Sequence, residues 1–251
     1  MGENIFIHLK ENKKHIEAYF TKILVFFLEN NKQFREKFIA KLLGIKDIEI
    51  NGDISVEYDS PYPPENKRPD ITIFNKDILI LIEIKIKSKQ GENQLIHYSE
   101  IIKHKLEKNE IKKGFVVFIP KYFEEVSKED QKTIKDNAIN ELIERNWSDL
   151  YRLFNEDKTF VNEMKWLKNQ YVELMGDENM QPFRTMNEGN LDNMGKEFSN
   201  MIRLFSELKR KLLEEGIEFD NKKDEGFVKL DSDNFLQMKI IIISMIFNIY
   251  I

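Results

Sequence analysis

Two carboxylates and a lysine stand at regular intervals in the most apolar part of the chain. Asp70 opens one short apolar run, and Glu83 and Lys85 lie in a second run, residues 78–87, which is rich in β-branched side chains. Because strand residues alternate between two faces, five isoleucines of the second run share one face, while Glu83, Lys85 and Lys87 share the other. The second run is therefore predicted to be a strand that leaves its sheet at a charged site.

The spacing of the two runs predicts which residues face each other. Only Lys76 and Asp77 separate them, which predicts a hairpin with a two-residue turn. Opposed positions then add to 153, so Asp70 opposes Glu83. Opposed Cβ atoms on one face lie about 4.5–5.5 Å apart. Two carboxylates at that distance repel each other unless a cation lies between them or one takes a proton. A three-residue turn would move Asp70 to the other face, so the interpretation depends on the turn length.

These groups are the parts needed for metal-assisted hydrolysis of a phosphodiester. Carboxylate oxygens suit a hard cation such as Mg²⁺, which makes Asp70 and Glu83 candidate metal ligands, and the carbonyl of Ile84 could supply a further oxygen. The ammonium of Lys85, on the Glu83 face, could hold the water nucleophile and stabilise charge on a phosphate. A bound metal would lower the pKa of that water.

At this point the residues resemble the signature of the PD-(D/E)XK nuclease superfamily. Pro69-Asp70 is followed, thirteen residues after the Asp, by Glu83-Ile84-Lys85. Gln94 and Tyr98 are similar to the Gln-x-x-x-Tyr element of the exonuclease-like branches, which lies near the phosphates. Glu17 resembles the first-helix acid that completes the metal site in many members.

The resemblance, best over residues 14–120, implies a restriction-endonuclease-like α/β fold with a mixed central sheet flanked by helices. It implies that Asp70 and Glu83 bind Mg²⁺ or Mn²⁺, that Lys85 assists the nucleophile, and that Glu17 is an accessory ligand. The likeness is to a poorly characterised bacterial branch often found near defence genes, so we expect a nuclease acting on DNA rather than RNA, in bacterial defence. The alternative is a catalytically inactive module that binds nucleic acid or a partner protein.

The remaining periodicity predicts a core over residues 1–145 and a helical extension over 146–251 packed on it. The core elements are predicted as helices at 12–28, 32–43 (ended by Gly44), 91–106 and 128–145, and strands at 54–58, 70–75, 78–87 and 114–120. The extension is predicted as a segment beginning at Trp147, helices at 158–175 and 190–215, and short strands at 217–220, 227–230 and 236–244.

The charge of the chain confines any phosphate contact to a local patch. With 39 basic and 44 acidic side chains, the net charge is -5. Residues 85–113 differ, because they hold eight lysines against four acids. We expect nucleic acid to contact Lys87 and Lys89 there, together with Gln94 and Tyr98. A solvated, lysine-rich helix is the alternative interpretation.

The composition also bears on compartment and partners. The absence of cysteine excludes disulfides and thiolate zinc sites and fits a reducing cytoplasm. No secretory leader is expected at the N-terminus. The apolar stretch at 240–251 is shorter than the roughly 20 residues of a membrane span, so no membrane partner is expected. The sequence is compatible with a homo-oligomer.

Overall fold

The computed structural model describes residues 6–7, 16–45, 54–62, 67–87, 91, 93–138 and 140–182, and four positions beyond them: 204, 207, 210 and 211. The chain divides into two compact units, Met1–Gln181 and Pro182–Ile251. The elements below belong to the first unit. The strands predicted after residue 216, and most of the helix predicted over 190–215, lie outside the described residues.

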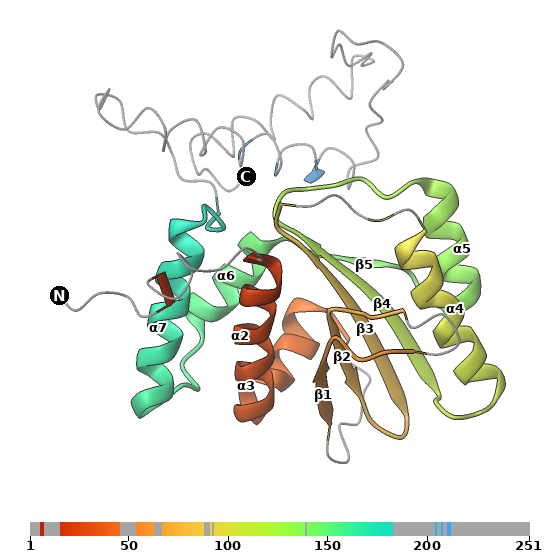
Figure 1. Ribbon diagram of the computed structural model, residues 1–251, viewed down its shortest axis with the longest axis horizontal. Coiled ribbons are helices and arrows are strands. Elements are labelled where there is room, and N and C mark those ends of the chain that lie inside the picture. The colour runs from red at the N-terminus through yellow and green to blue at the C-terminus, as the bar shows by residue number, and fades with distance from the viewer. Residues whose placement is uncertain are drawn as a thin grey trace, which may run out of the picture. The chain divides into compact units, whose positions relative to one another are not determined.

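A five-stranded mixed sheet forms the centre of the first unit (Figure 1). Its strands follow the order of the chain: β1 (Ser55–Tyr58), β2 (Ile71–Phe74), β3 (Ile78–Lys85), β4 (Lys113–Pro120) and β5 (Ile143–Glu144). The first three strands pair antiparallel, and β3, β4 and β5 pair parallel. The predicted mixed sheet is confirmed.

Helices cover both faces of this sheet (Figure 1). One face is covered by α2 (Ile16–Asn30), α3 (Lys32–Lys37), the π-helical turn η1 (Phe38–Leu42), α6 (Trp147–Glu156) and α7 (Asn162–Asp177). The other face is covered by α4 (Gln94–Glu107) and α5 (Lys128–Ala138). The crossover from β3 to β4 runs through α4, as parallel pairing requires.

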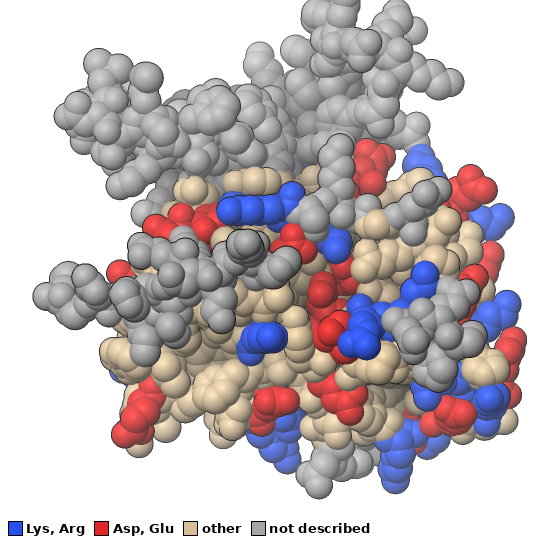
Figure 2. Space-filling view, in the orientation of Figure 1, with Lys and Arg blue, Asp and Glu red and all other residues tan. Residues whose placement is uncertain are grey.

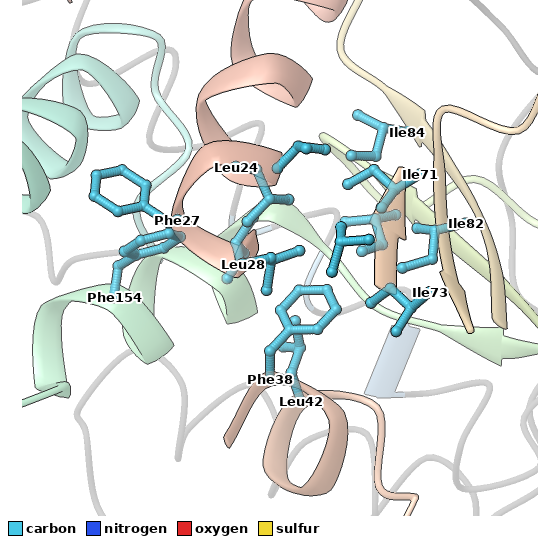
Figure 3. Close-up of a cluster of buried hydrophobic side chains, with 14 of the residues drawn as sticks. Leu24, Phe27, Leu28, Phe38, Leu42, Ile71, Ile73, Ile82, Ile84 and Phe154 are labelled. Atoms are coloured by element: carbon cyan, nitrogen blue, oxygen red, sulfur yellow. The ribbon is translucent and has the colours of Figure 1, made fainter. Parts of the chain in front are cut away.

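The larger apolar core lies on the α2 face and contains the isoleucine side of β3 (Figure 3). The five isoleucines at 78, 80, 82, 84 and 86 are all buried there, as the alternation predicts. Phe27 of α2 packs edge-on against Phe154 of α6, with ring centroids 5.3 Å apart. The hydroxyl of Tyr171, on α7, donates to the carbonyl of Phe20 on α2 (3.0 Å). Helices α6 and α7 thus share a core with the sheet.

The smaller core lies on the α4 face and contains the other side of β3. Leu79 and Leu81 pack there with Leu95 and Ile102 of α4. Glu83 comes next on this side and ends the apolar part of the face. The same strand therefore supports two cores and then presents a charged group at its carboxyl end.

One local prediction was wrong. The helix predicted over 128–145 ends at Ala138, and Ile143 and Glu144 instead pair with β4, because the open edge of that strand offers unpaired backbone groups. The predicted helical segment over 32–43 is present, as α3 followed directly by the π-helical turn η1. Gly44 follows it with a φ of 74°, a left-handed conformation that suits glycine at a helix end.

Within the described residues, no helix combines the length and the apolarity that crossing a membrane requires.

The contact between β4 and α4 makes Gly114 sensitive to substitution. A Cβ at this position would overlap the Cγ2 methyl of Ile102 and lie 3.2 Å from the Ile102 Cβ, a β-branched side chain with little freedom to move. We expect Gly114→Ala to lower the free energy of unfolding by about 1–3 kcal/mol, measured by urea unfolding.

Gly176 provides the matched control, because a Cβ there meets nothing within 4 Å inside helix α7. Gly176→Ala should raise the free energy of unfolding by up to about 1 kcal/mol. Equal effects of the two substitutions would contradict the close packing of α4 on β4.

Candidate active site

A two-residue turn joins β2 to β3, and Asn75 closes it. The backbone N–H of Asn75 donates to the carbonyl of Ile78 (3.1 Å). Its side-chain oxygen accepts from the N–H groups of Asp77 (2.8 Å) and Ile78 (2.9 Å). The turn therefore has the even length on which the predicted register depends.

The register places the two carboxylates at the same end of the hairpin. Ile71, at the start of β2, pairs with Ile82. Asp70 stands one position before Ile71 and Glu83 one position after Ile82, so the two acids are opposed. The Glu83 side chain lies on the same face as Leu79 and Leu81, which is the α4 face, since alternate residues of a strand share a face. Asp70, just before β2, turns its carboxylate toward the backbone of Ile84.

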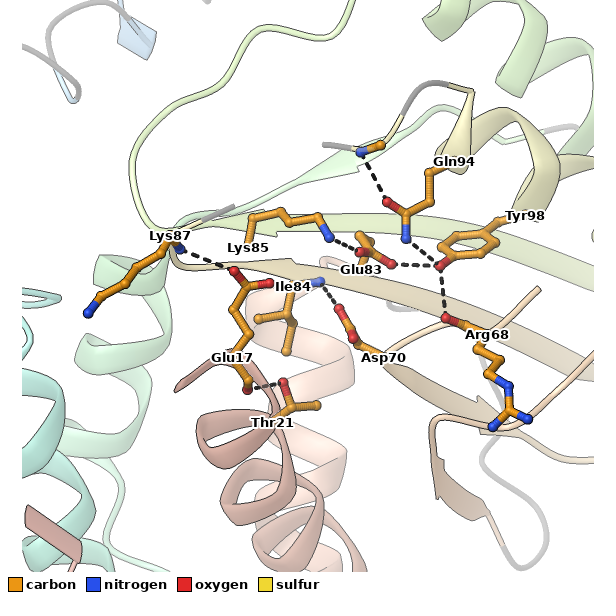
Figure 4. A network of polar contacts seen from close by, with 11 residues as sticks. Glu17, Thr21, Arg68, Asp70, Glu83, Ile84, Lys85, Lys87, Gln94 and Tyr98 are labelled. Carbon is orange, nitrogen blue, oxygen red and sulfur yellow. Dashed lines mark hydrogen bonds and ion pairs between the residues drawn. The ribbon is translucent and has the colours of Figure 1, made fainter. Parts of the chain in front are cut away.

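The carboxylate of Asp70 continues the hydrogen bonding where β2 stops (Figure 4). Its Oδ2 accepts from the N–H of Ile84 at 2.7 Å. In an antiparallel ladder the N–H and C=O of one residue point to the same neighbouring strand. Those of Ile78 point to β2, and so do those of every second residue after it, up to Ile84. The carbonyl of Ile84 therefore faces the side of Asp70, whereas that of Lys85 faces β4 and accepts from Lys121 N–H (2.7 Å).

Glu83 is held at both carboxylate oxygens (Figure 4). Oε1 forms an ion pair with the ammonium of Lys85 (2.5 Å), and Oε2 accepts from the hydroxyl of Tyr98 (2.6 Å). The Glu83 side chain is 1% exposed and that of Lys85 is 13% exposed. The structure thus places the Lys85 ammonium against Glu83, where the ammonium could also contact a group bound beside that carboxylate.

Gln94 and Tyr98 stand one turn apart on α4, as their spacing predicts. Tyr98 is 1% exposed and its hydroxyl points inward to Glu83. Gln94 donates to the Tyr98 oxygen (3.0 Å) and accepts from the N–H of Gly91 (3.2 Å). This placement favours a role beneath the carboxylates over contact of Tyr98 with a nucleic acid.

Glu17 approaches the site from α2 on the other face of the sheet (Figure 4). Its Oε1 accepts from the backbone N–H of Lys87 (3.2 Å), just beyond the end of β3. Its charge acts on Asp70 and Lys85. The structure therefore brings the acid of the first helix to the same end of β3 as the other site residues.

Burial dominates the electrostatics of the two opposed carboxylates. Burial, with the charge of Glu83 second, raises the pKa of Asp70 to about 8, although the Ile84 hydrogen bond and Lys85 oppose the change. Burial also raises the pKa of Glu83, against the charge and hydrogen bond of Lys85 and the hydrogen bond of Tyr98. Asp70 therefore holds a proton at neutral pH when no cation is bound.

Lys85 and Tyr98 keep their protons beside Glu83. Burial alone would lower the pKa of Lys85, but the charge and hydrogen bond of Glu83 outweigh it, and the pKa is raised. Burial and the charge of Glu83 raise the pKa of Tyr98. Both side chains thus face Glu83 as donors.

The donor set fits a hard divalent cation. It consists of carboxylate and carbonyl oxygens from Asp70, Glu83 and Ile84, the ligand type that Mg²⁺ prefers. The raised pKa of Asp70 indicates a shortage of positive charge, and a cation can take the place of the proton. No three histidine or acidic side chains of the described ranges form a metal cluster by themselves. A cation here would also need water ligands, which Mg²⁺ usually keeps.

Those lysines of residues 85–113 that the structure describes do not form one basic edge, and acidic side chains lie among the basic ones on the face shown in Figure 2. Lys87 is exposed beside the site, and Lys89 lies outside the described residues. Lys105 pairs with Glu110, and Lys112 pairs with Asp77 at the hairpin turn, the opposite end of β3. The predicted local excess of positive charge is therefore divided between the two ends of the sheet.

Arg68 is a site residue that sequence reasoning missed. Its carbonyl lies 3.1 Å from the Tyr98 hydroxyl, and its exposed guanidinium pairs with Asp59 (3.2 Å). Its position two residues before Asp70 could have indicated this role, since the backbone before a candidate metal ligand helps to set the position of that side chain.

The raised pKa of Asp70 makes a prediction about stability in the absence of metal. The folded protein keeps a proton on Asp70 up to about pH 8, whereas the unfolded chain releases it near pH 4, so wild type loses stability as the pH rises between these values. Asp70→Asn removes the titrating carboxyl group and can keep the Ile84 hydrogen bond. We expect it to be more stable than wild type in EDTA, by about 1–3 kcal/mol at pH 8 and by less at pH 5.

Urea unfolding at the two pH values measures this difference. Asp59→Asn is the control, because the carboxylate it removes is exposed. An Asp70→Asn variant that gains no stability between pH 5 and pH 8 would show that Asp70 is ionised in the folded protein.

Comparisons with known proteins extend the likeness beyond the site residues. A model of the PD-(D/E)XK nuclease superfamily matches residues 4–198, a range that includes all the site residues above. The five-stranded mixed sheet flanked by helices is consistent with a restriction-endonuclease-like fold. No curated protein and no solved structure matches the chain. From the match over most of its length, the chain belongs to the PD-(D/E)XK nuclease superfamily.

Proposed function

We propose that this protein is a nuclease that hydrolyses phosphodiester bonds of nucleic acid with the help of Mg²⁺ or Mn²⁺. The observation that carries the proposal is the opposed Asp70–Glu83 pair at the end of the hairpin, in which Glu83 is buried and Asp70 is half-buried, with the Lys85 ammonium 2.5 Å from Glu83. A purely structural site has little reason to keep two opposed acids whose pKa values are both raised. Family membership supports the same reading.

The residues divide the work of hydrolysis among them. Asp70, Glu83 and the Ile84 carbonyl would hold the cation, and Glu17 would be an accessory ligand. When bound, such a cation supplies charge stabilisation at the phosphate and a lowered pKa for water. Lys85 donates hydrogen bonds to the nucleophilic water and to the phosphate oxygens, because its raised pKa keeps it protonated. The carboxylates would thus bind the positive cation, and the Lys85 ammonium would stabilise the negative charge on the phosphate.

The finer assignments follow from the family resemblance. We propose DNA rather than RNA as the substrate and bacterial defence as the setting. Lys87, exposed beside the site, is the candidate for contact with substrate phosphates. A catalytically inactive binding module is the competing function, since both oxygens of Glu83 already have protein partners. That module would bind nucleic acid without metal and in a salt-sensitive manner.

Cleavage assays on labelled single- and double-stranded DNA and RNA test the proposal. We expect wild type to cleave DNA with Mg²⁺ or Mn²⁺ and to lose the activity in EDTA. Lys85→Ala should lower the rate at least about 100-fold, because the water and phosphate lose their hydrogen-bond donor.

Lys112→Ala is the matched control, since it removes an exposed lysine that pairs with Asp77 at the opposite end of β3, roughly 20 Å away. It should cleave like wild type. If neither cation supports cleavage of any substrate, or if Lys85→Ala is as active as wild type, the proposal fails.

The role of Glu17 is tested by the metal dependence of the rate. Glu17→Gln can keep the hydrogen bond from Lys87 N–H while it removes one negative charge. We expect the Mg²⁺ concentration for half-maximal cleavage to rise about 3–10-fold, with little change in the maximal rate, because ligand charge sets cation affinity.

Glu29→Gln, at the exposed far end of α2, should leave the Mg²⁺ dependence unchanged. An unaltered Mg²⁺ dependence of Glu17→Gln would remove Glu17 from the cation site.

A further inference from the structure

The hydroxyl of Tyr98 joins three parts of the protein at one atom (Figure 4). From its place on α4 it lies 2.6 Å from Glu83 Oε2 on β3 and 3.1 Å from the carbonyl of Arg68, two residues before Asp70. Tyr98 itself is 1% exposed, so solvent cannot replace these partners. One buried hydroxyl thus contacts one carboxylate directly and the backbone that leads to the other.

The hydrogen bonds around this hydroxyl run in one direction. The N–H of Gly91 donates to Gln94 Oε1 (3.2 Å), which fixes the orientation of the Gln94 amide. The amide nitrogen of Gln94 must then donate to the Tyr98 oxygen (3.0 Å). The single hydroxyl proton of Tyr98 is left for the acceptors at Glu83 and Arg68. The start of α4 therefore orients a donor toward the carboxylate pair.

A second donor matters for Glu83 because the last torsion of a glutamate is only weakly restrained by itself. Lys85 restrains Oε1 alone. With Tyr98 on Oε2, the two oxygens are held from two elements and the plane of the carboxylate is fixed. The contact with the Arg68 carbonyl restrains the approach to Asp70 in the same way.

We propose that Tyr98 is a positioning residue, oriented by Gln94, that sets the geometry of Glu83 and Asp70 for a divalent cation. This rests on the cation site of the proposed function, but it replaces direct substrate contact as the role of Tyr98. Partners that orient metal ligands in this way typically change metal affinity 10–100-fold when they are removed.

The test is a calorimetric titration of the full chain with Mn²⁺, without substrate. We expect Tyr98→Phe to weaken Mn²⁺ binding about tenfold, because the ring remains while Glu83 loses a donor. Tyr62→Phe is the matched control, since Tyr62 packs against the same apolar cluster on the α4 face. It should bind Mn²⁺ like wild type.

Gln94→Met gives a second route, which also serves if Tyr98→Phe does not fold. It removes the donor to the Tyr98 oxygen at a half-buried position, and it should weaken Mn²⁺ binding about 2–5-fold.

The inference would be overturned if folded Tyr98→Phe bound Mn²⁺ with an affinity within twofold of wild type. If only Gln94→Met folds, the same criterion applies to that variant. A wild type that binds no Mn²⁺ would also overturn the inference. Cleavage is measured separately. If wild type binds Mn²⁺ more tightly than Tyr98→Phe does but cleaves no substrate, the positioning role is supported and the nuclease proposal fails.

Discussion

The register of the β2–β3 hairpin is the constraint on which the site depends. A two-residue turn closed by Asn75 makes opposed positions add to 153, and Asp70 meets Glu83 only in that register. A shift of one residue would move Asp70 to the α2 face, because strand side chains alternate. The isoleucine face of β3 opposes such a shift, since it would expose apolar side chains that are now buried. The same core that stabilises the hairpin therefore also fixes the distance between the two acids.

The acids are a cost that the surrounding structure only partly offsets. Burial disfavours both charges, and the charge of Glu83 raises the pKa of Asp70 further. Lys85 and Tyr98 donate to Glu83, and the Ile84 N–H donates to Asp70. These donors leave Asp70 with a raised pKa. Under the proposed function, a bound cation would offset this unfavourable charge, so the site would be more stable with a cation than without one.

Features that depend on neighbouring residues in the sequence could be predicted, and features that depend on tertiary packing could not. The alignment of Asp70 with Glu83 depends on a turn and two adjacent strands, and short-range arithmetic was sufficient. The role of Tyr98 depends on how α4 packs, and helical spacing alone did not show that its hydroxyl points inward. The pairing of Ile143 with β4 depends on an open sheet edge, which outweighed the helical pattern before it. Tertiary packing, rather than propensity, decided the last two.

The charge distribution shows the same dependence on the fold. Helix α4 runs back along the sheet from Gln94, so the lysines at its end lie near the hairpin turn, although the sequence places them in one run with Lys85. A chain with a net charge of -5 gives a phosphate no long-range attraction, and Lys85 is engaged with Glu83. Under the proposed function, a phosphate would therefore meet its positive charge at short range, in the cation and in the Lys85 beside it. Binding of substrate would then depend on prior binding of the cation, because without it the Lys85 charge is neutralised by Glu83 and the site offers a phosphate little net positive charge.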